Sequence, residues 1–592
     1  MTVSRNKIIT YQGNVVSLKI ENVPADRIVW TCGNEDIVFI RRFASVPEGV
    51  LLVMKAAGST NVTVSCGDET VYVPVTVCPP HDSFNEENVR FFIGDLHDHT
   101  SNNHKIDEFR ARTEGLPSDS IGCVKSEGLL DFFVVTDHAG LMDDHDFFRS
   151  FVSAEELSDE GLVVFGGAES QVNLYEKDFY GLSHKNAGEV ITLNADNYVD
   201  APDWEIFFSR MKENEDAVFS FAHPQVVGWD ENGIWCFDPE NKGTDLMKKR
   251  FCLTEMGTGD DNGGSNMIHE WMYSLFLDCG FHVSPVSCSD CHGPAWGFDA
   301  WGGKTVIVAS EKNKEAFLRA MRARRTYATE SGVRLWYTVN GKPGCGHIEA
   351  EDRYVFDVRI GTLDGFGKAD VHVLQVISDG GLCVYEENVQ GKDAVSFALD
   401  TPESCWFYLR LVDAHGCRTW SQPVLVNGKT PKKTALPVPE RLDKHRFDAR
   451  LADGGDATVL INGDPTKPLV FDGTSGCVTV DMGELYEISG VGIYPFRFTI
   501  ADCHYGKDFG IQKCCASMAK NYEIAVSVNG KDFRRVYTGS VRAYGKQEIA
   551  FFDEKMRARY VRFDFLNTIG SAQSDERFAA MPLCVGELDI FA

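Results

Sequence analysis

The sequence predicts an α/β domain flanked by β-rich domains in one multidomain chain, and three observations lead to this fold class. The chain has 592 residues, and at roughly 100–200 residues per domain this length corresponds to about three to five domains. Apolar residues alternate with polar ones between frequent turn residues at both ends of the chain. Between residues 88 and 330, short apolar runs alternate instead with longer helix-like segments, a rhythm typical of α/β folds.

Composition narrows the class of protein. With 58 Lys and Arg against 87 Asp and Glu, the formal net charge is −29, which argues against general binding to nucleic-acid backbones. No run approaches the roughly 18 consecutive apolar residues of a membrane-spanning helix. Hydrophobic residues make up 43% and charged residues 24% of the chain, as in ordinary folded proteins. The sequence indicates no particular oligomeric state.

Cysteine usage and the first residues bear on location. The 18 cysteines mostly stand singly in strand-like runs, unlike the disulfide frameworks of small secreted domains. The opening MTVSRNKIITYQG lacks the apolar core of a secretory signal. We therefore expect reduced cysteines and a cytoplasmic location. An extracellular location stays open if a signal has been removed from the sequence.

Residues 1–80 predict a β-sandwich. Alternating runs such as VVSLKIEN, VLLVMKA and TVYVPVTV are separated by Gly, Asn and Asp, with turn signals about every 8–12 residues. The stretch AAGSTNVTVSCGDETVYVPVTV resembles the closing half of bacterial immunoglobulin-like domains. We therefore expect an Ig-like sandwich, followed by a linker at Pro79-Pro80.

The apolar runs between residues 88 and 330 share one feature at their ends. FFIGDLH, DFFVVTDH, LVVFGGAE, AVFSFAHP and FHVSPVSCSD each end in or next to His, Asp or Glu. In α/β folds, reactive groups collect at the carboxyl ends of the strands. His97 and His99 stand two apart, so their side chains leave a strand end on the same face. Imidazole together with carboxylate suits Zn, Mn or Fe better than Mg or Ca.

These motifs, DLHDHTSNN, VVTDHAG, GGAES, HKN, AHP and SDCHG, resemble in content and order the polymerase-and-histidinol-phosphatase (PHP) family of metal-dependent hydrolases. The resemblance implies a distorted (βα)7 barrel that holds two or three divalent transition-metal ions. It implies as metal ligands His97, His99, His138, Glu169, His184, His223, Asp290 and His292. It implies as catalytic groups Asp290, Glu169, His184 and Glu255.

The sequence departs from the family pattern in two places. After the first motif it reads SNNHKID, where His104 or Asp107 would replace the usual next ligand. Glu255 lies where some members carry another ligand or a substrate contact. We further expect Asp137 to support a ligand histidine.

Three functions follow as hypotheses. Divalent ions lower the pKa of bound water toward about 7, and the resemblance favours a phosphoesterase acting on a glycan or glycoconjugate. Hydrolysis of a non-phosphate bond in a glycan, as in a glycosidase or esterase, is the first alternative. A non-catalytic glycan-binding protein with a degenerate barrel is the second. Arg324 and Arg325 in ARRTYAT are candidate substrate contacts, because an Arg fork binds phosphate bidentately.

Residues 331–432 return to strand-like runs, among them RLWYTVNG and YVFDVRIG, and predict a β-rich accessory domain with few candidate catalytic groups. The Pro- and Lys-rich segment NGKTPKKTALPVPERLDK then predicts a linker. We expect truncation after about residue 430 to preserve activity on a small soluble substrate but to weaken action on a polymeric or surface-bound one, because the removed C-terminal module would act only as a tether that raises the local substrate density without touching the chemical step.

Residues 445–592 contain LINGDPTKPLVFDG, CVTVDMGELYEISGVGIYPF and RARYVRFDFL. These segments resemble the discoidin-like domain, also called coagulation factor V/VIII type C. The resemblance implies a jelly roll that binds carbohydrate, here a glycan or phosphorylated glycan substrate, and a structural Ca²⁺ near Asn462, Asp464 and Glu587. Tyr505 and Phe509 either stack on sugar or are buried aromatics.

Overall fold

The structure is a computed structural model. It describes residues 1–24, 27–101, 115–177, 183–199, 201, 204–224, 228–230, 233–235, 245–258, 266–292, 296–297, 303–429, 440–465, 467–495, 516–541, 548–572 and 579–592. Side chains are described for all of these except a few stretches, of which residues 173–188 matter below. Within the described residues, helices long and apolar enough to span a bilayer are absent.

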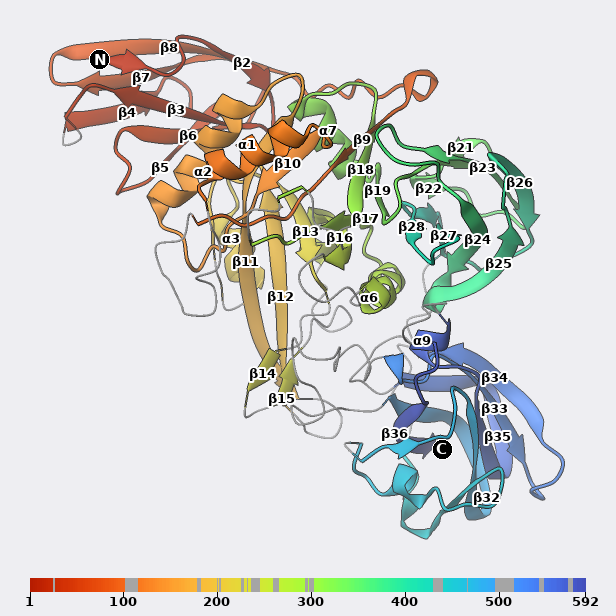
Figure 1. The fold of residues 1–592 in the computed structure, drawn as a ribbon. Coiled ribbons are helices and arrows are strands. Elements are labelled where there is room, and N and C mark those ends of the chain that lie inside the picture. Colours follow the sequence, from red (N-terminus) through yellow and green to blue (C-terminus); the bar gives the residue numbers. More distant parts are fainter. Residues whose placement is uncertain are drawn as a thin grey trace.

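The N-terminal part is a pair of four-stranded sheets (Figure 1). One contains β1 (Thr2–Val3), β3 (Val15–Glu21), β6 (Gly49–Met54) and β5 (Val38–Arg42). The other contains β2 (Ile8–Tyr11), β8 (Glu69–Cys78), β7 (Gly58–Cys66) and β4 (Ile28–Cys32). Alternation sets the buried faces: Val73 and Val75 lie in the core, whereas Tyr72 faces solvent. The two sheets enclose one apolar core that includes Leu18 and Trp30.

The centre of the molecule is a long mixed sheet. Its first part runs in the order β17 (Ser284–Cys288), β16 (Phe251–Thr258), β13 (Val218–Ala222), β12 (Ser183–Leu193), β11 (Val163–Lys177), β10 (Phe132–Val135) and β9 (Arg90–Gly94). The helices of this region are α1 (Pro117–Glu127), α2 (Asp144–Leu157), α3 (Trp204–Arg210), α5 (Asp245–Arg250), α6 (Asn266–Asp278) and α7 (Lys314–Arg322). A small hairpin, β14 (Gly228–Asp230) with β15 (Gly233–Trp235), forms a separate two-stranded sheet beside β12.

This sheet differs from the all-parallel repeat of strand and helix that the motifs imply. β12 runs antiparallel to both β11 and β13, whereas β9, β10, β13, β16 and β17 make parallel pairs. The reason is local: β11 and β12 form a long hairpin, and antiparallel neighbours need no crossover helix. The sheet nevertheless curls, because Ser284 on β17 donates to the carbonyl of Thr326 beyond β9. The antiparallel β12 is therefore a departure from the (βα)7 arrangement that the resemblance implies.

The central sheet continues beyond β9 into strands that come after residue 330 in the sequence. The order beyond β9 is β18 (Lys304–Ala309), β19 (Thr326–Thr329), β28 (Arg418–Trp420), β27 (Trp406–Asp413), β24 (Val371–Ser378) and β25 (Leu382–Asn388), with β22 (Gly346–Ile348) and β29 (Val424–Val426) at the side. A second sheet of β21 (Lys342–Pro343), β20 (Val333–Val339), β23 (Tyr354–Thr362) and β26 (Ala394–Leu399) packs on it. Their shared core includes Ile93 and Val306 of the central sheet, so the accessory region is built onto β9 and β18.

The C-terminal part is a seven-stranded sheet. Its strands are β30 (Asp448–Leu451), β31 (Leu469–Val470), β32 (Gly476–Pro495), β33 (Asn521–Ser527), β34 (Arg534–Ser540), β35 (Glu548–Phe565) and β36 (Cys584–Phe591). The register of β32 on β35 shifts between Asp481 and Tyr486, and such irregularities bend long strands. Two short 3₁₀ helices, η4 (Lys444–Arg446) and η5 (Thr458–Ile461), and the helix α9 (Ile569–Ala572) complete this unit.

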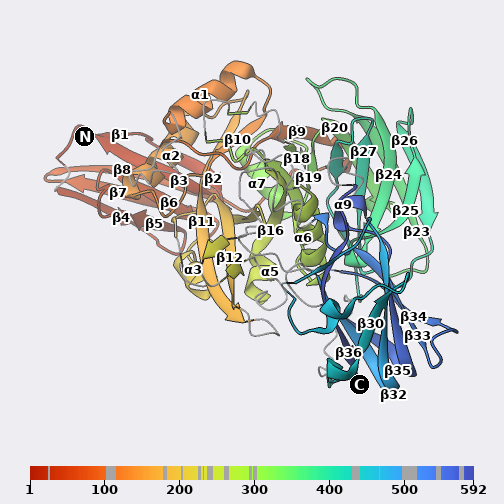
Figure 2. The same ribbon diagram turned by 60° about the horizontal axis from the view of Figure 1, so that its bottom comes forward.

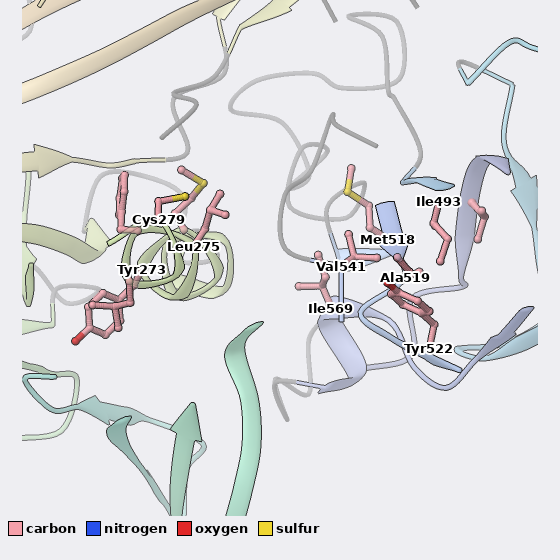
Figure 3. Packing of buried hydrophobic residues seen from close by; sticks show 14 of the residues in the cluster. Tyr273, Leu275, Cys279, Ile493, Met518, Ala519, Tyr522, Val541 and Ile569 are labelled. Carbon is pink, nitrogen blue, oxygen red and sulfur yellow. The ribbon is translucent and has the colours of Figure 1, made fainter. Parts of the chain in front are cut away.

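The central sheet region, the accessory region and the C-terminal unit meet at the short helix η3 (Asp379–Gly381). The carboxylate of Asp278 at the end of α6 accepts hydrogen bonds from Gly380 N at 3.1 Å and from Trp406 Nε1 at 3.0 Å. From the C-terminal unit, Lys520 Nζ donates to Gly380 O at 3.3 Å. One apolar cluster includes residues of α6 and of the C-terminal unit; Figure 3 shows Tyr273 and Leu275 on one side and Met518 and Ile569 on the other. Figure 2 shows the same neighbourhood of α6 and α9 from another direction.

Candidate metal centre

Five strands of the central sheet bring the sequence motifs to one edge. His97 and His99 follow β9, His138 follows β10, Glu169 lies in β11, His223 follows β13, and Asp290 and His292 follow β17. The loops are tied together by their backbones, since Asp290 N donates to His97 O at 2.9 Å and His99 N donates to Cys291 O at 3.0 Å. Parallel strands place their carboxyl ends at one edge of a sheet, which explains why motifs nearly 200 residues apart meet.

Glu169 and Asp290 lie at the middle of the cluster. Glu169 Oε2 lies 2.7 Å from His138 Nδ1, and its Oε1 lies 3.0 Å from His223 Nε2. Asp290 Oδ1 lies 2.9 Å from His99 Nε2 and 3.3 Å from His97 Nε2. His97 and His99 are fully buried. Glu169 therefore faces imidazoles that follow two different strands, β10 and β13, whereas Asp290 faces the two imidazoles that follow β9.

Imidazole nitrogens also face one another. The Nε2 atoms of His97 and His99 are 3.0 Å apart, and those of His138 and His292 are 3.4 Å apart. The ring of His99 stacks on the rings of both His138 and His292, with centroids 4.2 and 4.1 Å away. Two nitrogens at such distances need a proton or a cation between their lone pairs. This observation favours a site built for positive charge.

Three groups of ligand atoms are close enough to share an ion. They are His99, His138 and His292; His97, His99 and Asp290; and His97, Glu169 and His223. Within each group the candidate atoms lie within 4.8 Å of one another. Two of the three groups combine two imidazoles with one carboxylate and the third consists of imidazoles alone, donor sets that suit Zn, Mn and Fe. The residues present thus fit divalent transition-metal ions.

Glu255 lies behind His97. Its Oε1 is 2.8 Å from His97 Nδ1, and its Oε2 accepts a hydrogen bond from the backbone N–H of His223 at 2.6 Å. A carboxylate on the far ring nitrogen fixes the tautomer and orientation of a ligand histidine. The contacts of Glu255 are therefore those of a positioning residue, in contrast to the catalytic role expected from the sequence.

Two candidate ligands have left-handed backbone conformations. The φ angle is +23° at His223 and +50° at Asp290, a region that is uncommon for residues other than Gly, although Asn, Asp and His are enriched in it. Such conformations cost about 1–3 kcal/mol and persist where the surroundings hold them. The hydrogen bonds from His223 N to Glu255 and from Asp290 N to His97 O supply that support. Both strained residues are candidate metal ligands.

Charge in the cluster follows from its own groups. Burial raises the pKa of Glu169, but the imidazoles of His138 and His97 lower it further, and the pKa lies well below its usual value. The pKa of Asp290 is likewise lowered by His97 and His99 against the effect of burial. Burial and the neighbouring His292 and His138 depress the pKa of His99. Ionised carboxylates and a neutral His99 are the protonation states that metal binding requires. Neighbouring carboxylates raise the pKa of His97 and His223 against the effect of burial, so these two rings must lose a proton when a metal binds.

Buried carboxylates surround the cluster. Asp137 accepts hydrogen bonds from the backbone N–H and the hydroxyl of Thr100, at 2.5 and 2.8 Å. Burial raises the pKa of Asp137 to about 7. Asp98 accepts a hydrogen bond from the Ser289 hydroxyl at 2.7 Å. Asp137 thus holds the loop after His99, and Asp98 joins that loop to the one carrying Asp290.

The remaining predicted residues have varied outcomes. His104, Asp107, Tyr505 and Phe509 lie outside the described residues, and of His184 the structure describes only the backbone, which pairs with Glu176. Arg325 forms an ion pair with Asp82 at 2.8 Å, and Arg324 Nε donates to His282 O. Both arginines are therefore engaged in structural contacts away from the cluster.

Sequence reasoning missed Glu189. Its Oε2 lies 3.4 Å from His223 Nε2, and its Oε1 accepts a hydrogen bond from Gln171. Glu189 sits on β12 opposite Gln171 and next to Ala222 of β13. Only the pairing register of β11 and β12 indicates that Glu189 belongs to the site. Glu169 pairs with Ile191, and Glu189 lies two residues before Ile191 on β12.

Comparisons with known proteins concern a quarter of the chain. A scan of protein-family models finds no match, and neither does a search of curated proteins. Among solved structures, the chain is similar to a CBM32-5 domain from Clostridium perfringens in complex with GalNAc-β-1,3-galactose, at 19% identity over 26% of this chain and 100% of that one, with a TM-score of 0.20. It is similar to a family 32 carbohydrate-binding module from the same organism in complex with galactose, at 14% identity over 26% and 98%, with a TM-score of 0.20. The C-terminal domain of a chitobiase from Bacteroides fragilis follows at 14% identity over 26% and 96%, with a TM-score of 0.18. Scores of this size carry no argument about function.

Proposed function

We propose that this protein is a metal-dependent hydrolase of the PHP type whose C-terminal unit binds a glycan. The observation that carries the proposal is the meeting of five histidines, two fully buried and three partly buried, with Glu169 and Asp290 at one sheet edge. Such a set has little structural use on its own, because burying several imidazoles and carboxylates is costly unless they hold a cation.

The residues divide into those that would hold the ions and Glu255, which would position one of them. His97, His99, His138, Glu169, His223 and His292 would hold the ions, with Glu255 fixing the ring of His97. Divalent ions bound there would supply a water of lowered pKa as nucleophile. Asp290 groups with His97 and His99 and would also hold an ion; its carboxylate stays ionised, because neighbouring imidazoles lower its pKa, and it would orient that water.

The substrate class rests on resemblance more than on side chains. A phosphoester in a glycan is our first assignment, and a non-phosphate glycan bond is the alternative. Arg324 and Arg325 are engaged elsewhere, so phosphate recognition would fall to the ions and the cluster histidines. The second alternative is a glycan-binding protein without turnover. It predicts that neither the phosphoester nor the non-phosphate glycan bond is hydrolysed, whether or not the protein binds metal.

Metal content and turnover test the proposal together. The protein is reconstituted with Zn²⁺, Mn²⁺ or Fe²⁺, desalted and analysed for metal, then assayed on generic phosphoesters and aryl glycosides. We expect at least two equivalents of metal in the wild type and a loss in His97→Ala. His445→Ala is the matched control, because His445 is 93% exposed in the C-terminal unit. Less than one equivalent in the wild type would contradict the proposal, and metal without turnover on any substrate would favour the binding protein.

Glycan binding is tested separately from hydrolysis. Isothermal titration of the full chain with galactose and with N-acetylgalactosamine-containing disaccharides uses the sugars named for the similar modules. We expect binding that survives His97→Ala, because the cluster and the C-terminal unit are separate sites. An absence of binding on a broad glycan array would remove the carbohydrate part of the proposal and leave the hydrolase part standing.

A further inference from the structure

Two carboxylates are buried side by side in the last strand. Glu587 and Asp589 stand two apart on β36, so their side chains leave the same face, and both are at most 1% exposed. Two buried carboxylates on one face are strongly unfavourable unless a cation neutralises them. The sequence led us to expect a Ca²⁺ ion near Glu587, with Asn462 and Asp464 as further ligands.

The cation beside this pair is a side chain of the protein. Lys444 Nζ contacts Glu587 Oε1, donates to Asp589 Oδ1 at 2.6 Å and donates to Leu588 O at 3.1 Å. These three acceptors match the three donors of an ammonium group. Arg441 Nη1 adds a second positive charge 3.6 Å from Asp589 Oδ1.

Lys444 is held there by the segment that precedes the C-terminal sheet, residues 440–446, which we call the strap. Leu442 N donates to Ile590 O, and Ala592 N donates to Glu440 O, both at 2.9 Å. The strap therefore runs along β36 as a short antiparallel partner, which its bridge between Arg441 and Phe591 also shows. Lys444 then reaches the carboxylates from a fixed backbone.

The groups around Glu587 do not fit a calcium ion. Ca²⁺ takes about 6–8 oxygen ligands, whereas Glu587 Oε1 receives the backbone N–H of Gly463 at 3.0 Å and the ammonium of Lys444. Asn462 Oδ1 accepts from Asp464 N at 2.7 Å, and the Asp464 carboxylate lies 2.8 Å from Lys467 Nζ. Of the described side-chain oxygens of Glu587 and Asp589, only Glu587 Oε2 lacks a hydrogen bond. A single oxygen beside an ammonium group is a poor calcium ligand.

We propose that the Lys444 ammonium is the resident cation of the C-terminal unit, so that this unit folds without a structural calcium ion. The proposal is independent of the hydrolase, because it concerns residues of the strap and β36 alone. It also sets the start of the unit. A chain that begins after residue 446 would lack the charge that the Glu587–Asp589 pair needs.

The experiment measures thermal unfolding of the full chain in buffer stripped of divalent ions, with and without added Ca²⁺, and hydrogen exchange of β36 peptides. We expect no shift of the wild-type midpoint on adding Ca²⁺. Lys444→Met should lower the midpoint of the C-terminal unit by on the order of 10 °C, because it leaves Glu587 without a cation and Asp589 with only Arg441 Nη1, 3.6 Å away. The double variant Lys444→Met with Glu587→Gln should regain more than half of that loss, because one of the charges is gone.

Lys467→Met is the matched control, since Lys467 is 70% exposed and pairs with Asp464 on the same unit. It should leave the midpoint and β36 exchange unchanged. A wild-type protein that is stabilised by Ca²⁺ would overturn the proposal, and so would Lys444→Met with wild-type stability. Should Lys444→Met fail to fold, the calcium arm on the wild type and the double variant still decide.

Discussion

Two residues of the candidate metal centre, His223 and Asp290, have left-handed backbone conformations. Asp290 combines a left-handed φ of +50° with a central place between His97 and His99. Asn tolerates this conformation and keeps the size of the side chain, whereas Ala does not tolerate it. The two substitutions therefore separate the effect of charge from the effect of backbone strain.

We expect Asp290→Asn to abolish turnover on any substrate found while the unfolding midpoint stays close to that of the wild type, because only the negative charge is lost. Asp290→Ala should lose turnover and about 1 kcal/mol of stability in addition, from strain at the left-handed backbone. Steady-state kinetics and thermal unfolding measure the two quantities. Wild-type turnover by fully metal-loaded Asp290→Asn would remove Asp290 from the mechanism.

Glu255 acts through two hydrogen bonds, to His97 Nδ1 and from His223 N. Gln keeps an oxygen for one of them and presents an amide N–H to the other. We expect Glu255→Gln to weaken metal affinity by about 10–100-fold, the usual effect of losing an outer carboxylate. Competition with a chelator measures this, and rescue of turnover at high metal concentration would identify a positioning role. A turnover defect that saturating metal leaves in place would restore the catalytic role expected from sequence.

His282 provides a pH dependence outside the metal centre. Burial, with Arg324 and His347 nearby, lowers the pKa of His282 to about 3, whereas in the unfolded chain it is about 6.5. The unfolded chain thus binds the proton more readily, so this contribution to stability is present above about pH 6.5 and falls as the pH drops. We expect a loss on the order of 1 kcal/mol between about pH 7 and pH 5.

His282→Phe should flatten that part of the pH profile. Chemical denaturation at several pH values measures it, and Phe retains the ring contact with His347, whose centroid lies 5.1 Å away. An unchanged profile in the variant would mean that other groups carry the acid sensitivity.

Much of the site could be predicted residue by residue, since His97, His99, His138 and Asp290 each follow an apolar run that forms a strand. A strand-terminal position is visible in sequence because the apolar run stops there. The roles of Glu255 and Glu189 were not predictable in the same way. They depend on which strands pair and in what register, and apolar periodicity does not encode strand order.

Among the elements, η3 joins three regions through very few atoms. Asp278 on α6 accepts from Gly380 N and Trp406 Nε1, while Lys520 reaches Gly380 O from the C-terminal unit. The indole of Trp406 is buried, and a buried donor left without an acceptor costs about 1–3 kcal/mol.

We expect Asp278→Ala to lower the free energy of unfolding by about 1–3 kcal/mol and to increase hydrogen exchange at η3 and α9. Asp278→Asn is the control, because its amide oxygen still accepts a hydrogen bond. Denaturant titration and exchange mass spectrometry measure both. Equal loss in the two variants would point to the charge of Asp278 rather than to its hydrogen bonds.

Element type was predictable more often than element partnership. The alternating runs of the N-terminal and accessory regions do form strands, as in β23, where Tyr354, Phe356 and Val358 are buried and their neighbours exposed. The antiparallel hairpin of β11 and β12 was not predictable, because a buried strand reads the same in either direction. Lys444 was missed for a similar reason, since a lysine in a linker-like segment gives no sign that it reaches a buried pair.

On the scale of the whole molecule, the C-terminal unit is more than a tether. The apolar cluster that includes Tyr273 and Leu275 of α6 also includes Met518 and Ile569, and a cavity of about 50 Å³ between them is lined by Glu270, Arg410 and Lys520. The linker-like sequence at residues 430–439 gave no indication of this packing.

We expect truncation after residue 430 to lower the unfolding midpoint of the remaining chain and to raise its binding of an apolar dye, because part of a shared core becomes exposed. This result would reverse the simple tether expectation. Differential scanning calorimetry and dye fluorescence measure it against the full chain. A truncated protein with an unchanged midpoint, low dye binding and full activity on small substrates would restore the tether.

The unbroken strand ladder from β17 to β25 has a mechanical consequence. β9 lies beside β18, and β19 lies beside β28, although more than 80 residues separate the members of each pair along the chain. A force that pulls the two ends of the molecule apart therefore acts on hydrogen-bonded strand pairs that the central and accessory regions share. We therefore expect the central and accessory regions to unfold together under tension. Among the described strands, the sheets of the N-terminal sandwich share no backbone ladder with this sheet; the sandwich is joined to the central region by side-chain contacts instead, among them the ion pair of Arg41 with Asp196 and an apolar core shared with α2.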